Sequence, residues 1–278
     1  MGNQNIAVGK PSPASKKSNT LLYVGVAALI IAIIGYSLSM GVFNSNSGYY
    51  GQNVSKSEMR ALYAIANNQT LASIVGTSAY SGLNPSAYIK RPNLTSLNSS
   101  GVPVMLYVGA EYCPFCAATR WPIVLTLMRF GNLTGLQYSA SSSTDTDPNT
   151  PTFSFVGSSY SSNYLRLKAF EVQNRTYGSL MQLPPDLGAI YNKYSNGIPF
   201  LDFGNKYIES GSLISPMQFD GKDWGTITAA LQNTNTTISQ SVIGAANIYT
   251  AQICEIINNS APVCAQPYVR AAASDFLS

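Results

Sequence analysis

The sequence predicts an α/β domain that lies outside a membrane and is joined to it by one N-terminal helix. Three observations support this prediction. An uncharged apolar run fills residues 21–43, and the 235 residues after it are enough to bury a full hydrophobic core. A short apolar run at 104–108 precedes a helical pattern at 117–130, as expected where helices pack on a sheet.

The composition excludes several classes of function. Charged residues are only 10% of the chain, whereas Ser, Thr and Asn supply 76 of the 278 residues, so we expect an uncharged polar surface. The sequence contains no histidine, which excludes Ser-His-Asp hydrolysis, Cys-His proteolysis and histidine-ligated metal sites. After residue 43 there are 13 basic and 12 acidic residues. A net charge of +1 gives this part of the chain no positive field for binding nucleic acid. We expect no nucleic-acid partner, no metal and no cofactor.

The apolar run at 21–43 predicts a transmembrane helix. Its 23 residues would form a helix of about 34 Å, enough to cross a hydrocarbon core of about 30 Å. The run is longer than the core of a signal peptide, although cleavage after the small-x-small segment Ser37-Leu38-Ser39 is an alternative. Three lysines precede the run, so residues 1–20 should form a cytoplasmic tail. We therefore expect a single-pass protein of the cell membrane, in contact with lipid through its anchor, whose C-terminal domain is extracytoplasmic and can form disulfides.

Acceptor motifs for N-glycosylation agree with an exported domain. The chain has eight Asn-x-Ser/Thr motifs, about twice the number expected by chance from its composition. The candidate asparagines are Asn53, Asn68, Asn93, Asn98, Asn132, Asn174, Asn235 and Asn258. We expect a glycoprotein.

The region between the anchor and the main domain predicts a linker and an N-terminal extension over 44–102. Residues 44–52 are rich in Gly, Ser and Asn, which is typical of a flexible linker. Residues 55–66 have the pattern of a short amphipathic helix capped by Ser57 that packs on the main domain. Residues 77–100 mix turn formers with single hydrophobics and predict a loop with short strands.

The main domain is expected over 103–270. The five apolar residues at 104–108, bounded by Pro103 and Gly109, predict a strand buried on both faces of a partly parallel sheet. The helical pattern at 117–130 follows and should stop at Gly131.

Further elements alternate through the rest of this domain. The expected strands are 137–143, 152–156, 164–172, 198–203 and 206–209. The expected helices are 179–195, 221–231 and 240–257. We expect residues 150–195 to be an insertion in the fold.

The motif Cys113-Pro114-Phe115-Cys116 is the most informative feature for function. A cysteine at the start of a helix faces unpaired backbone N–H groups and the positive end of the helix dipole, which lowers its pKa. Cys116, one turn further on, is placed to attack a mixed disulfide formed on Cys113. An unreactive disulfide and half of a tetrahedral metal site are alternatives. The buried strand before the motif favours the redox interpretation.

The residues around this motif resemble the thioredoxin superfamily, in which a strand leads into Cys-Pro-x-Cys at a helix start and a cis-proline lies opposite. More narrowly, several segments are similar to an uncharacterised family of membrane-anchored thioredoxin-like proteins of archaea and some bacteria. These segments are GAEYCPFCAATRW, NTPTFSF, GIPFLDFGNKY and ANIYTAQIC with PVC. The resemblance covers roughly 103–266. It implies a thioredoxin-like three-layer fold.

The resemblance also implies that Pro199 is cis, faces Cys113 and presents backbone to a substrate chain, whereas a trans proline at a strand start is the alternative. This chain has Tyr112 where thioredoxin has Trp, and no evident counterpart of thioredoxin's buried Asp. Glu111 is either a proton relay or an exposed surface residue. Arg120 either adds positive potential near the sulfurs or lies on a solvated helix face.

Aromatic and apolar residues near the motif are candidates for a substrate groove. We assign Tyr112, Phe115 and Ile198 to it. Tyr107 either lines this groove or packs in the core.

The second cysteine pair, Cys254 and Cys264, brackets a short segment at a helix end. A structural disulfide that closes this loop, worth about 2–3 kcal/mol, is the preferred interpretation. One alternative is a second redox pair that exchanges electrons with the first, and another is one metal held by all four cysteines.

These inferences predict a membrane-anchored, extracytoplasmic thiol–disulfide oxidoreductase that uses the CPFC pair. Its partners would be protein thiols or disulfides of the envelope or of secreted proteins, together with a membrane redox partner. The alternative is a redox-inert glycosylated scaffold that binds other cell-surface proteins.

Overall fold

The computed structural model describes residues 46–277 of the chain. The expected cytoplasmic tail at 1–20 and the expected membrane helix at 21–43 lie outside the described residues. Within the described part of the chain, no helix has both the length and the apolar character that crossing a bilayer requires.

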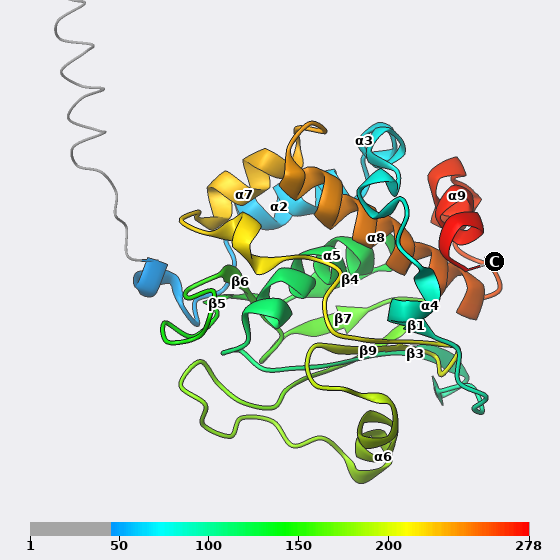
Figure 1. The fold of residues 1–278 in the computed structure, drawn as a ribbon, viewed down its shortest axis with the longest axis horizontal. Coiled ribbons are helices and arrows are strands. Elements are labelled where there is room, and N and C mark those ends of the chain that lie inside the picture. The colour runs from blue at the N-terminus through cyan, green and yellow to red at the C-terminus, as the bar shows by residue number, and fades with distance from the viewer. Residues whose placement is uncertain (1–45, 278) are drawn as a thin grey trace, which may run out of the picture. The chain divides into compact units, whose positions relative to one another are not determined.

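A mixed sheet of six strands forms the centre of the fold (Figure 1). Its strands are β1 (Ile89–Lys90), β2 (Asn98–Ser99), β3 (Val102–Gly109), β8 (Arg166–Glu171), β9 (Phe200–Phe203) and β10 (Tyr207–Ser210). The order is β1-β10-β9-β3-β2, and β8 also pairs with β3. Strand β3 runs parallel to β8 and antiparallel to β9, so that Tyr107 is level with Ala169 on one side and Leu201 on the other. The expected buried, partly parallel strand at 104–108 is therefore confirmed.

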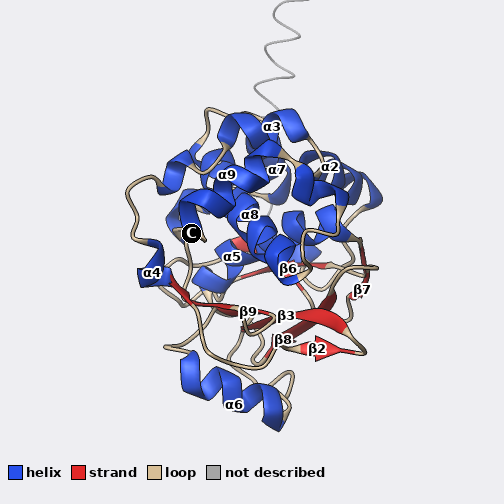
Figure 2. Cartoon of the chain, turned by 90° about the vertical axis from the view of Figure 1, so that its right-hand side faces the viewer, coloured by secondary structure: helices blue, strands red, loops and turns tan. Residues whose placement is uncertain are grey.

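Helices cover both faces of this sheet (Figures 1 and 2). They are α6 (Pro185–Tyr194) on one face and α5 (Pro114–Phe130) and α8 (Thr237–Ile256) on the other. Because side chains alternate along a strand, Leu106 and Val108 pack in the cluster under α6, whereas Met105 and Tyr107 pack in the main core beneath α5 and α8. All four side chains are buried, and the mixed α/β architecture predicted from the sequence is observed.

Four further helices enclose α5 and α8. They are α2 (Lys56–Ala66), α3 (Gln69–Val75), α7 (Trp224–Leu231) and α9 (Pro267–Phe276). Helix α2 packs on α5, and the other three pack on α8. The expected helix at 55–66 is thus present and docks on the domain, but its cap is Ser55 rather than Ser57, because the Ser55 hydroxyl accepts the Glu58 N–H. Helices α3 and α9 were not predicted.

The segment 150–195 is not an insertion as a whole, and that expectation is wrong. Its strand β8 pairs with β3 over six residues and belongs to the central sheet. Strands outside that sheet form two antiparallel pairs, β4 with β7 and β5 with β6. Their bounds are β4 (Asn132–Thr134), β5 (Gln137–Ala140), β6 (Pro151–Ser154) and β7 (Ser159–Ser161). The apolar strand pattern alone did not show which of these strands would join the main sheet.

Local sequence explains where several elements begin and end. Helix α5 starts at Pro114 and includes both the expected 117–130 segment and the second cysteine of the motif. Helix α6 begins at Pro185, where a proline loses no hydrogen bond. Gly204 and Asn205 take positive φ values of 63° and 59° in the tight turn between β9 and β10. The remaining helical pieces are η1 (Asn46–Tyr49), η2 (Ser78–Tyr80), α4 (Pro85–Tyr88), η3 (Pro216–Phe219) and η4 (Pro262–Ala265).

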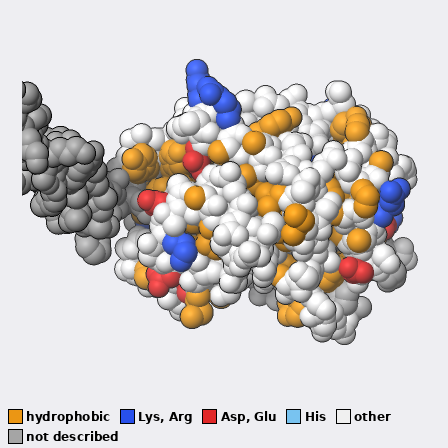
Figure 3. All heavy atoms as spheres, turned by 90° about the horizontal axis from the view of Figure 1, so that it is seen from above, with side chains coloured by type: hydrophobic (Ala, Val, Ile, Leu, Met, Phe, Trp, Pro, Cys, Tyr) orange, Lys and Arg blue, Asp and Glu red, His pale blue; other side chains and the backbone are white. Residues whose placement is uncertain are grey.

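The surface agrees with the low charge of the sequence. On the face formed by the outer helices, hydrophobic side chains are scattered among uncharged polar atoms, and charged side chains are few (Figure 3). Among the asparagines of the glycosylation motifs, Asn174 is half-buried and the other seven are exposed.

Candidate functional site

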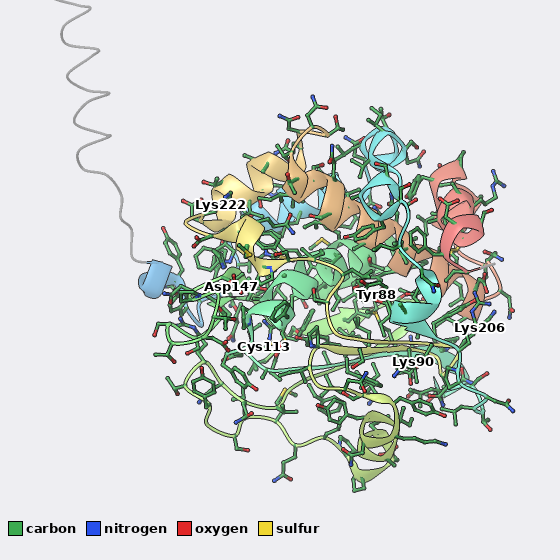
Figure 4. All side chains as sticks on the ribbon, in the orientation of Figure 1. Tyr88, Lys90, Cys113, Asp147, Lys206 and Lys222 are labelled. Carbon is green, nitrogen blue, oxygen red and sulfur yellow. A yellow bond between two sulfur atoms is a disulfide. The ribbon has the colours of Figure 1, made fainter. Side chains whose placement is uncertain are left out.

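Cys113 caps the N-terminus of α5. Its backbone is extended, with φ −75° and ψ 121°, and its Sγ accepts the backbone N–H of Cys116 at 3.1 Å. Pro114 occupies the first turn, where its missing N–H costs no bond. Figure 4 shows Cys113 at the start of α5. Its sulfur therefore lies at the positive end of the helix, where the first backbone N–H groups lack intrahelical partners.

The two sulfurs of the motif have opposite tendencies to ionise. Cys113 is 5% exposed, whereas Cys116 is fully buried, and both are free thiols. The hydrogen bond from the Cys116 thiol lowers the pKa of Cys113; burial opposes this, and the Cys116 N–H and the Arg120 charge reinforce it. Burial and the neighbouring Cys113 raise the pKa of Cys116 well above its ordinary value. Cys113 is therefore the more acidic of the two thiols and Cys116 the less acidic.

Pro199 lies on the other side of Cys113. The Ile198–Pro199 peptide is cis, and the Ile198 carbonyl oxygen is 4.0 Å from the Cys113 Sγ. Ile198 and Val172 pack against the two cysteines. The chain therefore brings the backbone before Pro199 next to the sulfur, although the two are 85 residues apart.

The expected groove residues take different positions around the sulfur. Tyr112 is half-buried and its ring lies 4.5 Å from that of Tyr177. Phe115 is 44% exposed and Ile198 is half-buried, so both are available to a partner. Tyr107 is fully buried in the main core, so its alternative placement in a groove is wrong.

Arg120 is fully buried, so the solvated helix face is also wrong for this residue. Its guanidinium donates to both carboxylate oxygens of Glu171, from Nε at 2.8 Å and from Nη2 at 2.5 Å. Nη2 also donates to the Ala110 carbonyl at 2.8 Å, an oxygen that accepts the Cys113 N–H at 3.2 Å as well. Arg120 therefore fixes the loop that carries Cys113 and adds a positive charge beneath it.

Glu171 is the buried acid that the sequence analysis did not find. Burial raises its pKa, and the Arg120 guanidinium opposes that shift. Burial disfavours the charged form of Arg120, but Glu171 and neighbouring groups outweigh this and raise the Arg120 pKa well above its ordinary value. The two residues are 51 positions apart, and only the β3–β8 register, which sets Glu171 opposite Gly109, brings them together. Glu111, in contrast, is partly exposed.

The second pair, Cys254 and Cys264, is a disulfide with a Cα–Cα distance of 5.5 Å. Cys254 lies in the last turn of α8 and Cys264 in η4, and both are buried. Within residues 46–277, no group of three or more His, Cys, Asp or Glu side chains is arranged to hold a metal ion.

Two other buried carboxylates lie in strands of the central sheet, Asp202 in β9 and Glu209 in β10. Burial raises the pKa of Asp202 to about 7, although the hydrogen bond donated by the Asn205 N–H acts to lower it. Burial also raises the pKa of Glu209 to about 7, although Gln252 donates to it at 2.7 Å. Neither has a cationic partner within salt-bridge distance among the described residues. No spacing in the sequence pointed to them.

Comparison with known proteins gives one match. A family described as a domain of unknown function, DUF929, matches residues 87–183. This span contains the CPFC motif and Glu171, and it ends before Pro199 and the second cysteine pair. No curated protein and no solved structure matches the chain.

Proposed function

We propose that this protein is a membrane-anchored, extracytoplasmic thiol–disulfide oxidoreductase with a thioredoxin-like fold. The observation that carries the proposal is the position of the Cys113 Sγ, which accepts a backbone N–H at the start of α5 and lies 4.0 Å from the Ile198 carbonyl beside Pro199. A free thiol with a lowered pKa, next to a second free thiol with a raised pKa, suits disulfide exchange.

The topology supports the thioredoxin-like assignment. Strand β3 leads directly into the cysteine motif at the start of α5, and the cis Ile198–Pro199 peptide lies opposite, just before β9. Helix α6 on one face of the sheet, with α5 and α8 on the other, matches a three-layer arrangement. This is the same set of features on which the resemblance to the superfamily rests.

In the first step, the Cys113 thiolate attacks one sulfur of a substrate disulfide. A new S–S bond forms between Cys113 and the substrate, the substrate S–S bond breaks, and the second substrate sulfur leaves as a thiolate that takes a proton. The N–H of Cys116 and the Arg120 charge favour the attacking thiolate. The Ile198 backbone and the exposed ring of Phe115 are placed to contact the substrate chain.

In the second step, Cys116 gives up its proton and attacks the Cys113 sulfur of the mixed disulfide. The mixed S–S bond breaks, the substrate leaves as its second thiolate, and the Cys113–Cys116 disulfide forms. Two electrons pass from the cysteine pair to the substrate. Run in reverse, the same steps oxidise a substrate dithiol, and the direction depends on the potential of the partner that regenerates the pair, a protein thiol or disulfide or a membrane redox partner.

The compartment is part of the proposal. The three lysines before the apolar run at 21–43 support a domain outside the cell membrane. The exposed glycosylation motifs suit an exported glycoprotein, and the Cys254–Cys264 disulfide suits an oxidising exterior.

The test uses the full chain in lipid nanodiscs, equilibrated with a glutathione series, with the redox state of each cysteine mapped by alkylation and mass spectrometry. We expect Cys113 and Cys116 to cycle at potentials above about −300 mV while Cys254 and Cys264 stay bonded. Cys116→Ser should accumulate a mixed disulfide on Cys113, and Cys113→Ser, the matched control, should not. A pair that never cycles and never forms the mixed disulfide would exclude the oxidoreductase and support the redox-inert scaffold.

A further inference from the structure

A second surface feature lies apart from the cysteine motif, between α2 and the chain at β4. It is a groove of about 650 Å³, within the range of about 300–1,000 Å³ that is typical of small-molecule sites. Its apolar lining comes from Val54, Met59, Tyr63, Met128, Leu133 and Leu136. Two of these are flexible methionines, which adapt to apolar ligands of varied shape.

Hydrogen bonds hold the walls of this groove in place. The Val54 N–H donates to the Leu136 carbonyl at 2.8 Å, which ties the start of α2 to the β4–β5 segment. The Asn67 side chain donates to the Met128 carbonyl at 3.3 Å and links the end of α2 to α5. Leu133 and Leu136 are buried in the main core and form the floor. The groove is therefore preformed by elements that belong to the fold.

Two cations lie at the rim. Lys56 and Arg60 are four residues apart on α2, so their side chains project from the same side of the helix, and both line the groove. Both are exposed, and neither has a carboxylate within salt-bridge distance among residues 46–277. Glu58, the acid between them, is engaged by the Thr228 hydroxyl instead. The rim thus presents two uncompensated positive charges beside an apolar channel.

We propose that this groove binds an anionic single-chain amphiphile of the long-chain fatty acid class. The hydrocarbon chain would lie along the apolar floor, and the carboxylate between Lys56 and Arg60. A free inorganic anion would leave the apolar lining uncovered, whereas a neutral hydrocarbon would leave both cations unused. The combination of the two in one cavity favours a ligand that carries both features.

The groove lies apart from the redox motif. Met128 is 15 residues along α5 from Cys113, which puts the groove about 22 Å from the redox motif. The inference does not depend on the proposed function.

The test is photo-crosslinking on the full chain in nanodiscs of neutral lipid, with a palmitic acid probe that carries a diazirine in its chain. We expect crosslinked peptides to contain α2, Met128 or the segment 132–136. Lys56→Glu with Arg60→Glu should lower the crosslinking yield by about tenfold or more, because the two cations that would face the carboxylate are replaced by acids that repel it. Both substitutions are at exposed helix positions that accept Glu, so the fold is retained.

Three comparisons make the result decisive. The matched control, Lys193→Glu with Arg270→Glu, reverses two exposed cations on α6 and α9 and should keep the wild-type yield. Unlabelled palmitic acid should compete better than hexadecanol, which lacks the charge. Ala64→Trp, which fills the groove from an exposed position on α2, should also lower the yield. Crosslinks confined to 21–43, or an equal yield from both charge-reversal variants, would overturn the proposal.

Discussion

The two cysteine pairs lie at helix ends of opposite polarity. Cys113 stands before α5, where backbone N–H groups point at its sulfur, whereas Cys254 lies in the last turn of α8, at the carbonyl end. The positive end of a helix favours a thiolate and the negative end disfavours it. The first pair is free in the structure and the second is bonded. Cys113 thus lies at the helix end that favours a thiolate, and the Cys116 thiol and the Arg120 charge lower its pKa as well.

A buried acid beside the first pair also differs from a buried acid that is bonded to α8. Glu171, beneath the first pair, is matched by the Arg120 guanidinium. Glu209 is bonded by Gln252, two residues before Cys254, and has no cation at salt-bridge distance in the described structure. The first region therefore keeps charge near its sulfurs, whereas in the second the raised pKa of about 7 keeps Glu209 neutral in mild acid.

The largest effect is expected from removing the buried cation. Arg120→Met leaves the Glu171 carboxylate buried without its partner, which should lower the free energy of unfolding by about 3–5 kcal/mol. It should also raise the pKa of Cys113, because the positive charge that favours its thiolate is lost. Urea unfolding can be followed by the fluorescence of the chain's two tryptophans, both buried in this domain, and the pKa by the pH profile of iodoacetamide alkylation.

The matched control for this prediction is Arg120→Met with Glu171→Leu. Without the unpaired carboxylate, it should regain most of the lost stability, while Cys113 should keep its raised pKa because the cation is still missing. If the single and double variants were equally stable, the unpaired Glu171 carboxylate would not be the cause of the lost stability.

The sequence could predict the local features of the cysteine site but not the contacts that depend on how the strands pair. The helix start at Pro114, the sulfur at the cap and the strand before it were predictable, because each depends on neighbouring residues and on the backbone at a helix end. The Arg120–Glu171 pair was not, because it depends on which strand lies beside β3. The role of β8 was missed for the same reason, since pairing register is a property of the folded sheet.

The free energy of unfolding should depend on pH through Glu209, a buried acid without a cationic partner among the described residues. The pKa of Glu209 is about 7 in the folded state and about 4 in an unfolded chain, so the folded state holds a proton that the unfolded chain releases. Its contribution is fully present below about pH 4 and is lost as the pH rises through about 7, a change of about 4 kcal/mol. Urea unfolding at pH 4, 5.5 and 8 measures it.

Glu209→Gln should flatten this profile, because an amide stays neutral at every pH and can still accept from Gln252. Asp202→Asn should act in the same direction, since the pKa of Asp202 is also raised to about 7. Stability that rises from pH 5.5 to 8 equally in wild type and Glu209→Gln would show that Glu209 is ionised in the fold.

A smaller loss of stability is expected when the second cysteine pair is removed. Cys254→Ala with Cys264→Ala opens a loop with a sequence separation of ten, which should lower the free energy of unfolding by about 2–3 kcal/mol. Exchange through Cys113 should continue at a nearly unchanged rate, because α5 makes no covalent link to this loop. A loss of exchange in the folded double variant would instead identify Cys254–Cys264 as a second redox pair that passes electrons to the first.

The smallest effect is expected from a substitution at Glu111. It compares an exposed acid with the buried acid Glu171 near the same sulfur. Glu111 is partly exposed, so solvent screens its charge, and Glu111→Gln should change the pH midpoint of Cys113 alkylation by less than about 0.3 units. Glu171→Gln should lower that midpoint clearly, because the Arg120 charge beneath Cys113 is then no longer neutralised. If Glu111→Gln moved the midpoint as far as Glu171→Gln, the surface carboxylate would act on the Cys113 sulfur as strongly as the buried one, and solvent screening would not separate the two acids.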